Sequence, residues 1–322
     1  MGLRAGATVL SLLSIPLDVC VLTALRDEEM PLTELSRAAG HPPATTMRSY
    51  LKGLVDLGAV ERQQEGSFPG TVTYSLTSAG EELIAVADAV QKWLAEAPEG
   101  PIALGDPAAK SAVKALVDGW NATIVRVLAA RPLALTELAK LITGISYPTL
   151  ERRLTAMRRT GQLQACRDSN GSRGNPYEAT RWLRQAVAPL LAAVAWERAW
   201  APAQTRGLSR IDIEAFFLLA VSLLELPEDL SGRCRLAVEL GRGGQAEYAG
   251  ATVTVHPDGR ATLVARLESD SEAWIGGTGG SWLRWMNGGP AGLLELGGDG
   301  TLARPILEAL HHLDSPLRAK AA

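Results

Sequence analysis

Leu32-Thr33-Glu34-Leu35 returns as Leu135-Thr136-Glu137-Leu138, 103 positions further along the chain. The same spacing, with no gap, relates further pairs: Leu51 and Leu154, Gly58 and Gly161, Tyr74 and Tyr177, Trp93 and Trp196. A repeated segment of this size is a small domain. We therefore expect two copies of one unit, followed by a region of a different kind.

The length and composition are those of an ordinary globular protein. The 322 residues leave room for two or three domains, and 47% of them are hydrophobic. No apolar run reaches the roughly 20 residues of a membrane span, and the apolar N-terminus predicts a helix rather than a signal peptide. The three cysteines are too widely spaced for a metal site or a disulfide framework, so we expect a cytoplasmic protein. The excess of Arg over Lys, with abundant Ala and Gly, is typical of a high-GC bacterial genome.

The net charge of -3 conceals a segregation along the chain. Residues 1–100 carry 7 basic and 13 acidic side chains, whereas residues 101–206 carry 15 and 7. Residues 207–322 are again acidic, with 10 and 15. A basic block between two acidic ones is expected if one domain meets a polyanion and the others do not.

Both copies predict helix, short helix, turn, helix, two strands and a closing helix. In the first copy the helices are expected at 7–26, with an interruption near Pro16, and at 30–39, 44–57 and 81–94, with Thr33 as a cap for the second. The strands of this copy are expected at 60–63 and 71–76. In the second copy the helices are expected at 112–129, 136–142, 148–160 and 183–200, and the strands at 163–167 and 177–180. We predict domains at 1–95, 108–206 and 207–322, with a Pro- and Gly-rich linker between the first two.

Three stretches of the first copy resemble the winged helix-turn-helix regulators of the HxlR/MarR type. They are Pro31-Leu32-Thr33-Glu34-Leu35, Leu51-Lys52-Gly53-Leu54-Val55-Asp56-Leu57-Gly58-Ala59-Val60 and Tyr74-Ser75-Leu76-Thr77-Ser78-Ala79-Gly80. The resemblance covers about residues 8–94; the second copy matches less well and lacks the glycine after Tyr177-Glu178-Ala179-Thr180. Such regulators bind double-stranded DNA as dimers, so the resemblance implies that both halves lie on one chain. Whether the whole chain also forms a homodimer is not decided by the sequence.

The third helix and the wing of each copy hold the candidate DNA-binding residues, since a helix fits the major groove and a wing reaches phosphates or the minor groove. In the second copy these are Thr149, Arg152, Arg153, Arg158, Arg159, Arg167 and Arg173; in the first they are Thr46, Arg48 and Lys52. The arginines favour the second copy as the main source of DNA contacts. The alternative is that these residues only form a solvated surface, with the first copy as a structural or dimerising half.

Beyond residue 207 the pattern predicts an α+β domain with strands at 234–240, 251–256, 261–267 and 293–296. Short helices are expected at 272–275 and 282–286. This order resembles the sterol carrier protein type 2-like domains, which hold apolar ligands between a sheet and helices. The candidate ligand-binding residues for an apolar or aromatic molecule are Trp274, Trp282, Trp285, Met286, Phe216 and Phe217. The alternative is that they are core or dimer contacts.

No catalytic, nucleotide-binding or metal-binding motif stands out, so we expect no enzyme, no cofactor, no metal and no membrane partner. Gln162-Leu163-Gln164 is similar to the Gln-x-Gln pair of tandem winged-helix DNA glycosylases, but the rest of that pattern is missing. The predicted fold class is mainly α with small β-wings, in two winged helix-turn-helix domains, plus a C-terminal α+β domain. The predicted function is a DNA-binding transcriptional regulator that senses an apolar ligand. A ligand-sequestering protein without a DNA role is the alternative.

Overall fold

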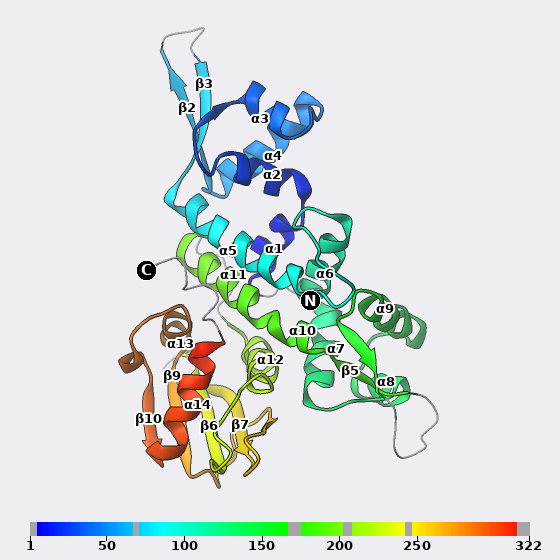
Figure 1. Cartoon of the computed structure of the whole chain (residues 1–322), viewed down its shortest axis with the longest axis vertical. Helices are drawn as coiled ribbons and strands as arrows, with labels where there is room; N and C mark the ends of the chain where they lie inside the picture. The colour runs from blue at the N-terminus through cyan, green and yellow to red at the C-terminus, as the bar shows by residue number, and fades with distance from the viewer. Residues whose placement is uncertain (1–4, 67–70, 167–174, 202–207, 242–246, 314–322) are drawn as a thin grey trace. The chain divides into compact units, whose positions relative to one another are not determined.

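The computed structural model describes residues 5–66, 71–166, 175–201, 208–241 and 247–313 (Figure 1). Its contacts divide the chain into two compact units. The N-terminal unit consists of residues 6–117 and 192–205; the C-terminal unit consists of 118–191 and 206–322, together with 1–5. The fold is mixed, with many helices and a five-stranded sheet near the C-terminus. The three-domain division stays a prediction.

The N-terminal unit contains a helical module with a three-stranded sheet. Its helices are α1 (Ala7–Leu13), α2 (Pro16–Ala24), α3 (Leu32–Ala38), α4 (Ala44–Asp56), α5 (Ser78–Ala95) and α6 (Pro107–Val117). Its strands are β1 (Met30–Pro31), β2 (Val60–Glu65) and β3 (Thr71–Leu76), in the antiparallel order β1-β3-β2. The second half of α11 (Val187–Trp200) also belongs to this unit.

Local sequence explains where the elements of this unit begin and end. Pro16 opens α2 and separates it from α1, as predicted. Gly58 follows α4 with φ +80°, a conformation that favours glycine. Two predictions were wrong: Met30 pairs with Tyr74 in β1 rather than starting a helix, and Thr33 lies inside α3 rather than capping it. Met30 can pair there because β3 bonds to β2 along one edge only, which leaves the backbone groups of its other edge available to β1.

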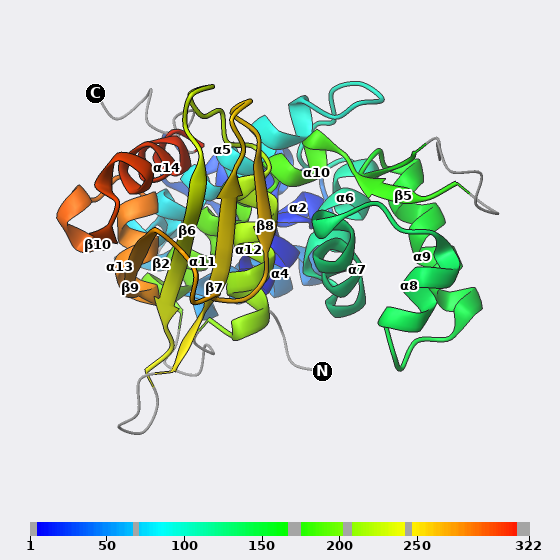
Figure 2. The same cartoon turned by 90° about the horizontal axis from the view of Figure 1, so that it is seen from below.

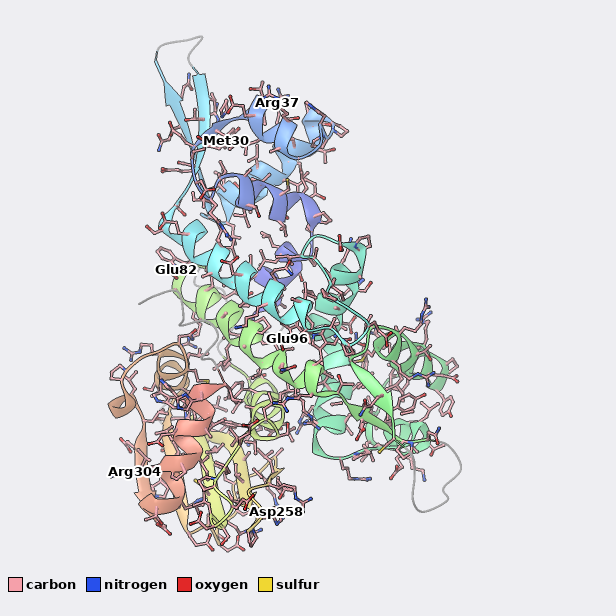
Figure 3. The ribbon with its side chains drawn as sticks, in the orientation of Figure 1. Met30, Arg37, Glu82, Glu96, Asp258 and Arg304 are labelled. Atoms are coloured by element: carbon pink, nitrogen blue, oxygen red, sulfur yellow. The ribbon has the colours of Figure 1, made fainter. Side chains whose placement is uncertain are left out.

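Within the N-terminal unit, helices that correspond at the 103-residue spacing pack on each other. α1 packs on α6, and the indole N–H of Trp196 on α11 donates to the Ala79 carbonyl at the start of α5, at 2.7 Å. Trp200 donates to Glu82 at 2.7 Å (Figure 3). The buried Glu197 carboxylate accepts the backbone N–H groups of Gly6, Thr8 and Val9 at 2.6–3.1 Å. These bonds satisfy amides that the first turn of α1 leaves unpaired.

The C-terminal unit begins with a second helical module. Its elements are α7 (Gly119–Ala130), α8 (Leu135–Leu141), α9 (Tyr147–Arg159), β4 (Leu163–Ala165), β5 (Tyr177–Ala179) and α10 (Arg181–Gln185). The bounds of α8 and α9 fall 103 residues after those of α3 and α4. The helix predicted at 112–129 is divided at Asp118, whose side chain caps α7 by accepting the amides of Trp120 and Asn121.

Hydrogen bonds recur at the same spacing. The Thr77 hydroxyl donates to the Gly58 carbonyl at 2.6 Å, and the Thr180 hydroxyl donates to that of Gly161 at 2.9 Å. The bridge between Leu133 and Tyr177 stands where Met30 pairs with Tyr74 in the first module. The two modules therefore share their local framework and not only their helix pattern.

The rest of the C-terminal unit is a mixed sheet with helices. The strands, in the order β10-β9-β6-β7-β8, are β10 (Glu295–Gly298), β9 (Ala273–Thr278), β6 (Gly232–Glu239), β7 (Tyr248–Val255) and β8 (Ala261–Val264). The helices are α12 (Arg210–Val221), α13 (Gly279–Met286) and α14 (Gly300–His312), with a short turn η1 (Ala291–Leu293). The predicted helix at 272–275 was wrong, because this segment is β9 and pairs in parallel with β6.

The alternation of side chains gives the sheet a buried face and a second, partly exposed face. Cys234, Leu236 and Val238 of β6 are buried on the first, whereas the residues between them are partly exposed. Figure 2 shows α12 behind β7, on the far side of the strands from the viewer. Among the described helices, none is by itself long and apolar enough to cross a membrane, while the bent pair α1 and α2 passes that test together.

Candidate nucleic-acid interface and ligand cleft

Helix α4 has an apolar back and a basic outer face. Met47, Leu51 and Leu54 are at most 1% exposed and fix the helix to the module core. The residues on the opposite side are exposed and spaced for one helix face: Thr45, Arg48, Ser49 and Lys52. Within the described chain, neither Arg48 nor Lys52 forms an ion pair. Two free cations are thus presented on an outward helix face.

The corresponding face of α9 has its charges at different positions from those of α4. At the 103-residue spacing the exposed residues are Pro148, Glu151, Arg152 and Thr155. Glu151 lies beside Arg152 in the first turns of this face, where α4 carries Arg48 and no acid. In the last turn the difference is reversed, because the exposed Asp56 of α4 corresponds to the exposed Arg159 of α9. The arginine count of the whole helix did not reveal this, because it ignores the direction of each side chain.

Arg153 was expected on the exposed face, but it faces the module interior. Its guanidinium donates to Asp118 at 2.8 Å and to Asn121 at 3.0 Å, and the side chain is one-quarter exposed. Burial of Asp118 opposes its ionisation. The hydrogen bonds from Arg153 and from the amides of Trp120 and Asn121 outweigh this, so the pKa of Asp118 lies below its usual value. Arg153 therefore joins α9 to the start of α7, and its guanidinium is held by Asp118 and Asn121.

The other predicted DNA-binding residues lie in varied surroundings. Arg158 and Arg159 are exposed in the last turn of α9. Thr149 is half-buried and accepts a hydrogen bond from the Ser146 hydroxyl at 2.9 Å, and Thr46 is half-buried on α4. Arg167 and Arg173 lie outside the described residues.

Two basic residues of the first module were missed. Arg37 on α3 (Figure 3) and Arg62 on β2 are exposed, and no ion pair engages them within the described chain. They extend the basic surface to the short helix and the wing strand. Their sequence signal was weak, because each is a single positive charge outside the third helix, with Glu34 near Arg37 and with Glu61 and Glu65 near Arg62.

The predicted ligand-binding aromatics mostly form a core. Phe217, Trp282, Trp285 and Met286 are at most 4% exposed. Ring centroids lie 5.3 Å apart for Phe217 and Trp282 and 5.9 Å apart for Trp282 and Trp285, in edge-to-face contacts. Phe216 is half-buried and packs on Phe217 at 5.3 Å. These residues line neither the cleft between β6, β7, β9 and β10 nor the hollow beside the start of α14.

Trp274 alone of this set lines a cleft. The cleft has a volume of about 410 Å³ and involves β6, β7, β9 and β10. Its lining comprises Arg235, Ala237, Glu239, Tyr248, Leu267, Trp274, Gly276, Gly277, Thr278, Ser281, Leu293 and Glu295. This volume is within the range of small-molecule sites.

The described residues hold no cluster of three or more His, Cys, Asp or Glu side chains suited to a metal. Gln162, of the pair compared with the glycosylases, is fully buried. The amide of Gln164 donates to Glu178 across the β4–β5 hairpin at 2.6 Å. Cys234 is buried in the sheet, and burial raises the pKa of its thiol to about 12, so it remains a protonated core residue.

The geometry of α3, α4 and the β2–β3 wing can be compared with known families. Residues 17–100 match the HxlR-like helix-turn-helix family model. The HxlR-like region thus runs from α2 through α5, and it indicates a DNA-binding transcriptional regulator. No curated protein matches the chain. The family match ends at residue 100 and gives no support to the resemblances suggested for residues 108–206 and 208–313.

Proposed function

We propose that this protein is a transcriptional regulator in which two winged-helix modules on one chain bind double-stranded DNA. In the first module α4 enters the major groove. In the second, Arg152, Arg158 and Arg159 contact the phosphate backbone. The sheet domain senses a small molecule and alters DNA affinity.

The basic outer face of α4 carries this proposal. Arg48 and Lys52 are exposed, one turn apart and free of ion pairs, and they lie in the region that matches the HxlR-like family. Arg can hydrogen-bond a guanine edge or a phosphate, and Lys a phosphate. A structural role alone would not require two unpaired cations on this face.

Two observations support a second winged-helix module. The bounds of α8 and α9 repeat those of α3 and α4, and the Thr180 bond to Gly161 repeats that of Thr77 to Gly58. In the N-terminal unit, α1 packs on its counterpart α6, and Trp196 of α11 bonds to α5. Pairing between corresponding helices is what two chains of a homodimer would otherwise provide.

Helix α12 offers a route from the sheet to the second module, because it packs on both β7 and α7. Arg126 of α7 forms an ion pair with the buried Glu214 of α12. Arg184 of α10 donates to the Leu218 carbonyl and to the Ser222 hydroxyl, at 3.4 and 2.7 Å. A ligand acts on DNA binding only if it binds two arrangements of these elements with different affinity.

The test is fluorescence anisotropy of the full chain with labelled DNA from the region upstream of its own gene. Replacing Arg48 and Lys52 with Ala should lower affinity about 30- to 1,000-fold at 150 mM salt, since each of the two lost contacts costs about 1–2 kcal/mol. Lys92→Ala with Lys110→Ala is the matched control, because both lysines are exposed on other helices of the same unit.

The sequestering alternative is favoured by the net charge of -6 in residues 1–100. It predicts no salt-dependent DNA binding by the wild-type chain. Equal affinities of the α4 variant and the control variant would also contradict the proposed role of α4.

A further inference from the structure

The partly exposed face of the sheet contains a row of small residues. Strand register places Gly250, Ala237 and Gly276 side by side on β7, β6 and β9. No side chain in this row extends beyond a β-carbon. A β-carbon at Gly250 would lie 1.9 Å from the Leu236 carbonyl oxygen, so only glycine fits there. The row leaves the space that the cleft occupies.

The next row supplies an aromatic wall, because Trp274 pairs with Gly297 of β10. A β-carbon at Gly297 would lie 2.2 Å from Nε1 of Trp274, and one at Gly276 would lie 3.1 Å from its six-membered ring. The indole therefore lies against the strand backbone over these glycines. Such close packing holds a flat aromatic surface in place beside the cleft.

Arg235, paired with Trp274 across β6 and β9, gives the cleft a positive charge. Its Nε is buried and has no hydrogen-bond partner, and no described carboxylate forms an ion pair with its guanidinium. By contrast Arg233, two residues earlier, pairs with Glu268 and Asp270. A buried N–H without an acceptor is unfavourable, and the guanidinium of this half-buried residue has no carboxylate to neutralise it within the described chain. A ligand carboxylate would supply that missing negative charge.

The carboxylates of the cleft lie away from Arg235. Glu239 is four residues further along β6, roughly 13 Å at the usual rise of a strand. Glu295 pairs with Gly276, in the row after that of Arg235. A second negative charge on a ligand would meet these carboxylates. The cleft thus favours a single anionic group at the Arg235 end.

One wall of the cleft is fixed by the segment that connects β8 to β9. The Thr252 hydroxyl donates to the Arg266 carbonyl and accepts the Glu268 amide, both at 2.9 Å. Leu267, between them, would lie 3.1 Å from a β-carbon at Gly250. Its side chain gives the cleft an apolar wall beside the row of small residues.

From this arrangement we infer that the cleft binds a planar aromatic monocarboxylate, with the carboxylate on Arg235 and the ring over Ala237, between the Trp274 indole and the Leu267 side chain. This assigns a ligand class to the sensing role proposed above and lies on the opposite face of the sheet from the aromatic core. Binding is measured without DNA, so a failure here leaves the DNA-binding proposal standing.

The experiment is isothermal titration calorimetry of the full chain with naphthalene-2-carboxylate. We expect a dissociation constant at or below about 1 mM. The neutral naphthalene-2-carboxamide and the dianion naphthalene-2,6-dicarboxylate should each bind about tenfold more weakly or worse.

Two variants of the cleft test the assignment. Arg235→Gln should lose the preference for the carboxylate over the amide, and Ala237→Leu should block both ligands by filling the cleft. Arg284→Gln is the control, because Arg284 is exposed on α13 and does not line the cleft. Circular dichroism checks that the variants are folded.

No binding of naphthalene-2-carboxylate by the wild-type chain would overturn the inference, as would equal affinity for the carboxylate and the amide. If either variant fails to fold, the ratio of the wild-type affinities for the carboxylate and the amide is by itself enough to support or overturn the inference. Wild-type affinity in a folded Ala237→Leu chain would place the ligand elsewhere and overturn it too.

Discussion

The first and second helical modules have the same framework and different surfaces. Gly58 and Gly161 end the third helix in both, and Thr77 and Thr180 cap the helix that follows the wing. The outward face of α4 is nevertheless basic, whereas that of α9 has an acid beside a base. Residues that determine backbone geometry have stayed the same, while the side chains that would meet DNA have not.

The interiors differ at two corresponding positions as well. Gly80 of the first module corresponds to the buried Leu183 of the second. Asp18 of α2 corresponds to Asn121 of α7, and both are buried. Substitutions at Gly80 and Asp18 therefore test whether the first module tolerates a different side chain at each of these buried positions.

The largest effect is expected at Gly80. A β-carbon there would lie 2.1 Å from the backbone oxygen of Ala59, so α5 must move away from β2. Gly80→Ala should lower the free energy of unfolding by about 3 kcal/mol or more, measured by urea denaturation. Gly53→Ala in α4 is the control. Nothing lies within 4 Å of its β-carbon, so it should stabilise by about 0.5–1 kcal/mol. Equal effects of the two substitutions would show that the close approach at Gly80 is not needed.

Asp18 should make the chain less stable as the pH rises. Burial raises the pKa of its carboxyl to about 7, so the folded state holds the proton after the unfolded state has lost it. The stability is fully present below about pH 4 and falls as the pH rises through 7. Asp18→Asn should be more stable than wild type by about 1–3 kcal/mol at pH 8 and nearly equal at pH 4.

Thermal unfolding at the two pH values measures this difference. The exposed Asp56→Asn serves as the control and should show little change at either pH. A destabilised Asp18→Asn at pH 8 would mean that the ionised carboxylate has a partner in the folded state.

A smaller effect is expected at Arg153. Arg153→Ala removes the bonds to Asp118 and Asn121 and should lower the unfolding free energy by about 1 kcal/mol, because the pair is partly exposed. Since the pKa of Asp118 is lowered, this contribution is present near neutral pH and is lost as the pH falls through the lowered pKa. DNA affinity should change less than threefold. A larger loss of DNA affinity in a folded Arg153→Ala variant would show that Arg153 contacts DNA.

The sequence was sufficient for the order of most helices and strands in both modules, because turns and helix periodicity are local, but it missed β1 and the break at Asp118. The third helix of each module and the break at Pro16 followed from such signals. Residue types did not reveal which way a side chain points: Arg153 had the spacing of an exposed residue, but its guanidinium turns towards the half-buried Asp118. Trp282 and Trp285 looked like pocket residues, yet they fill the core.

The cleft itself could not have been predicted, since it depends on register between strands far apart in sequence. Gly250, Ala237 and Gly276 form a row only once β6, β7 and β9 are aligned. Likewise, β9 was mistaken for a helix because a short apolar run does not distinguish strand from helix without its partner.

The salt dependence of DNA affinity tests most directly whether the two modules have diverged in their DNA surfaces. The logarithm of the association constant falls linearly with the logarithm of salt concentration, with a slope set by the number of phosphate contacts. Arg48→Ala with Lys52→Ala should reduce that slope by about one to two and weaken the preference for the native sequence over random DNA. Arg152→Ala should reduce the slope by about one at most and keep the preference. A greater loss of slope and preference from Arg152→Ala than from the α4 variant would contradict the assignment of DNA reading to the first module.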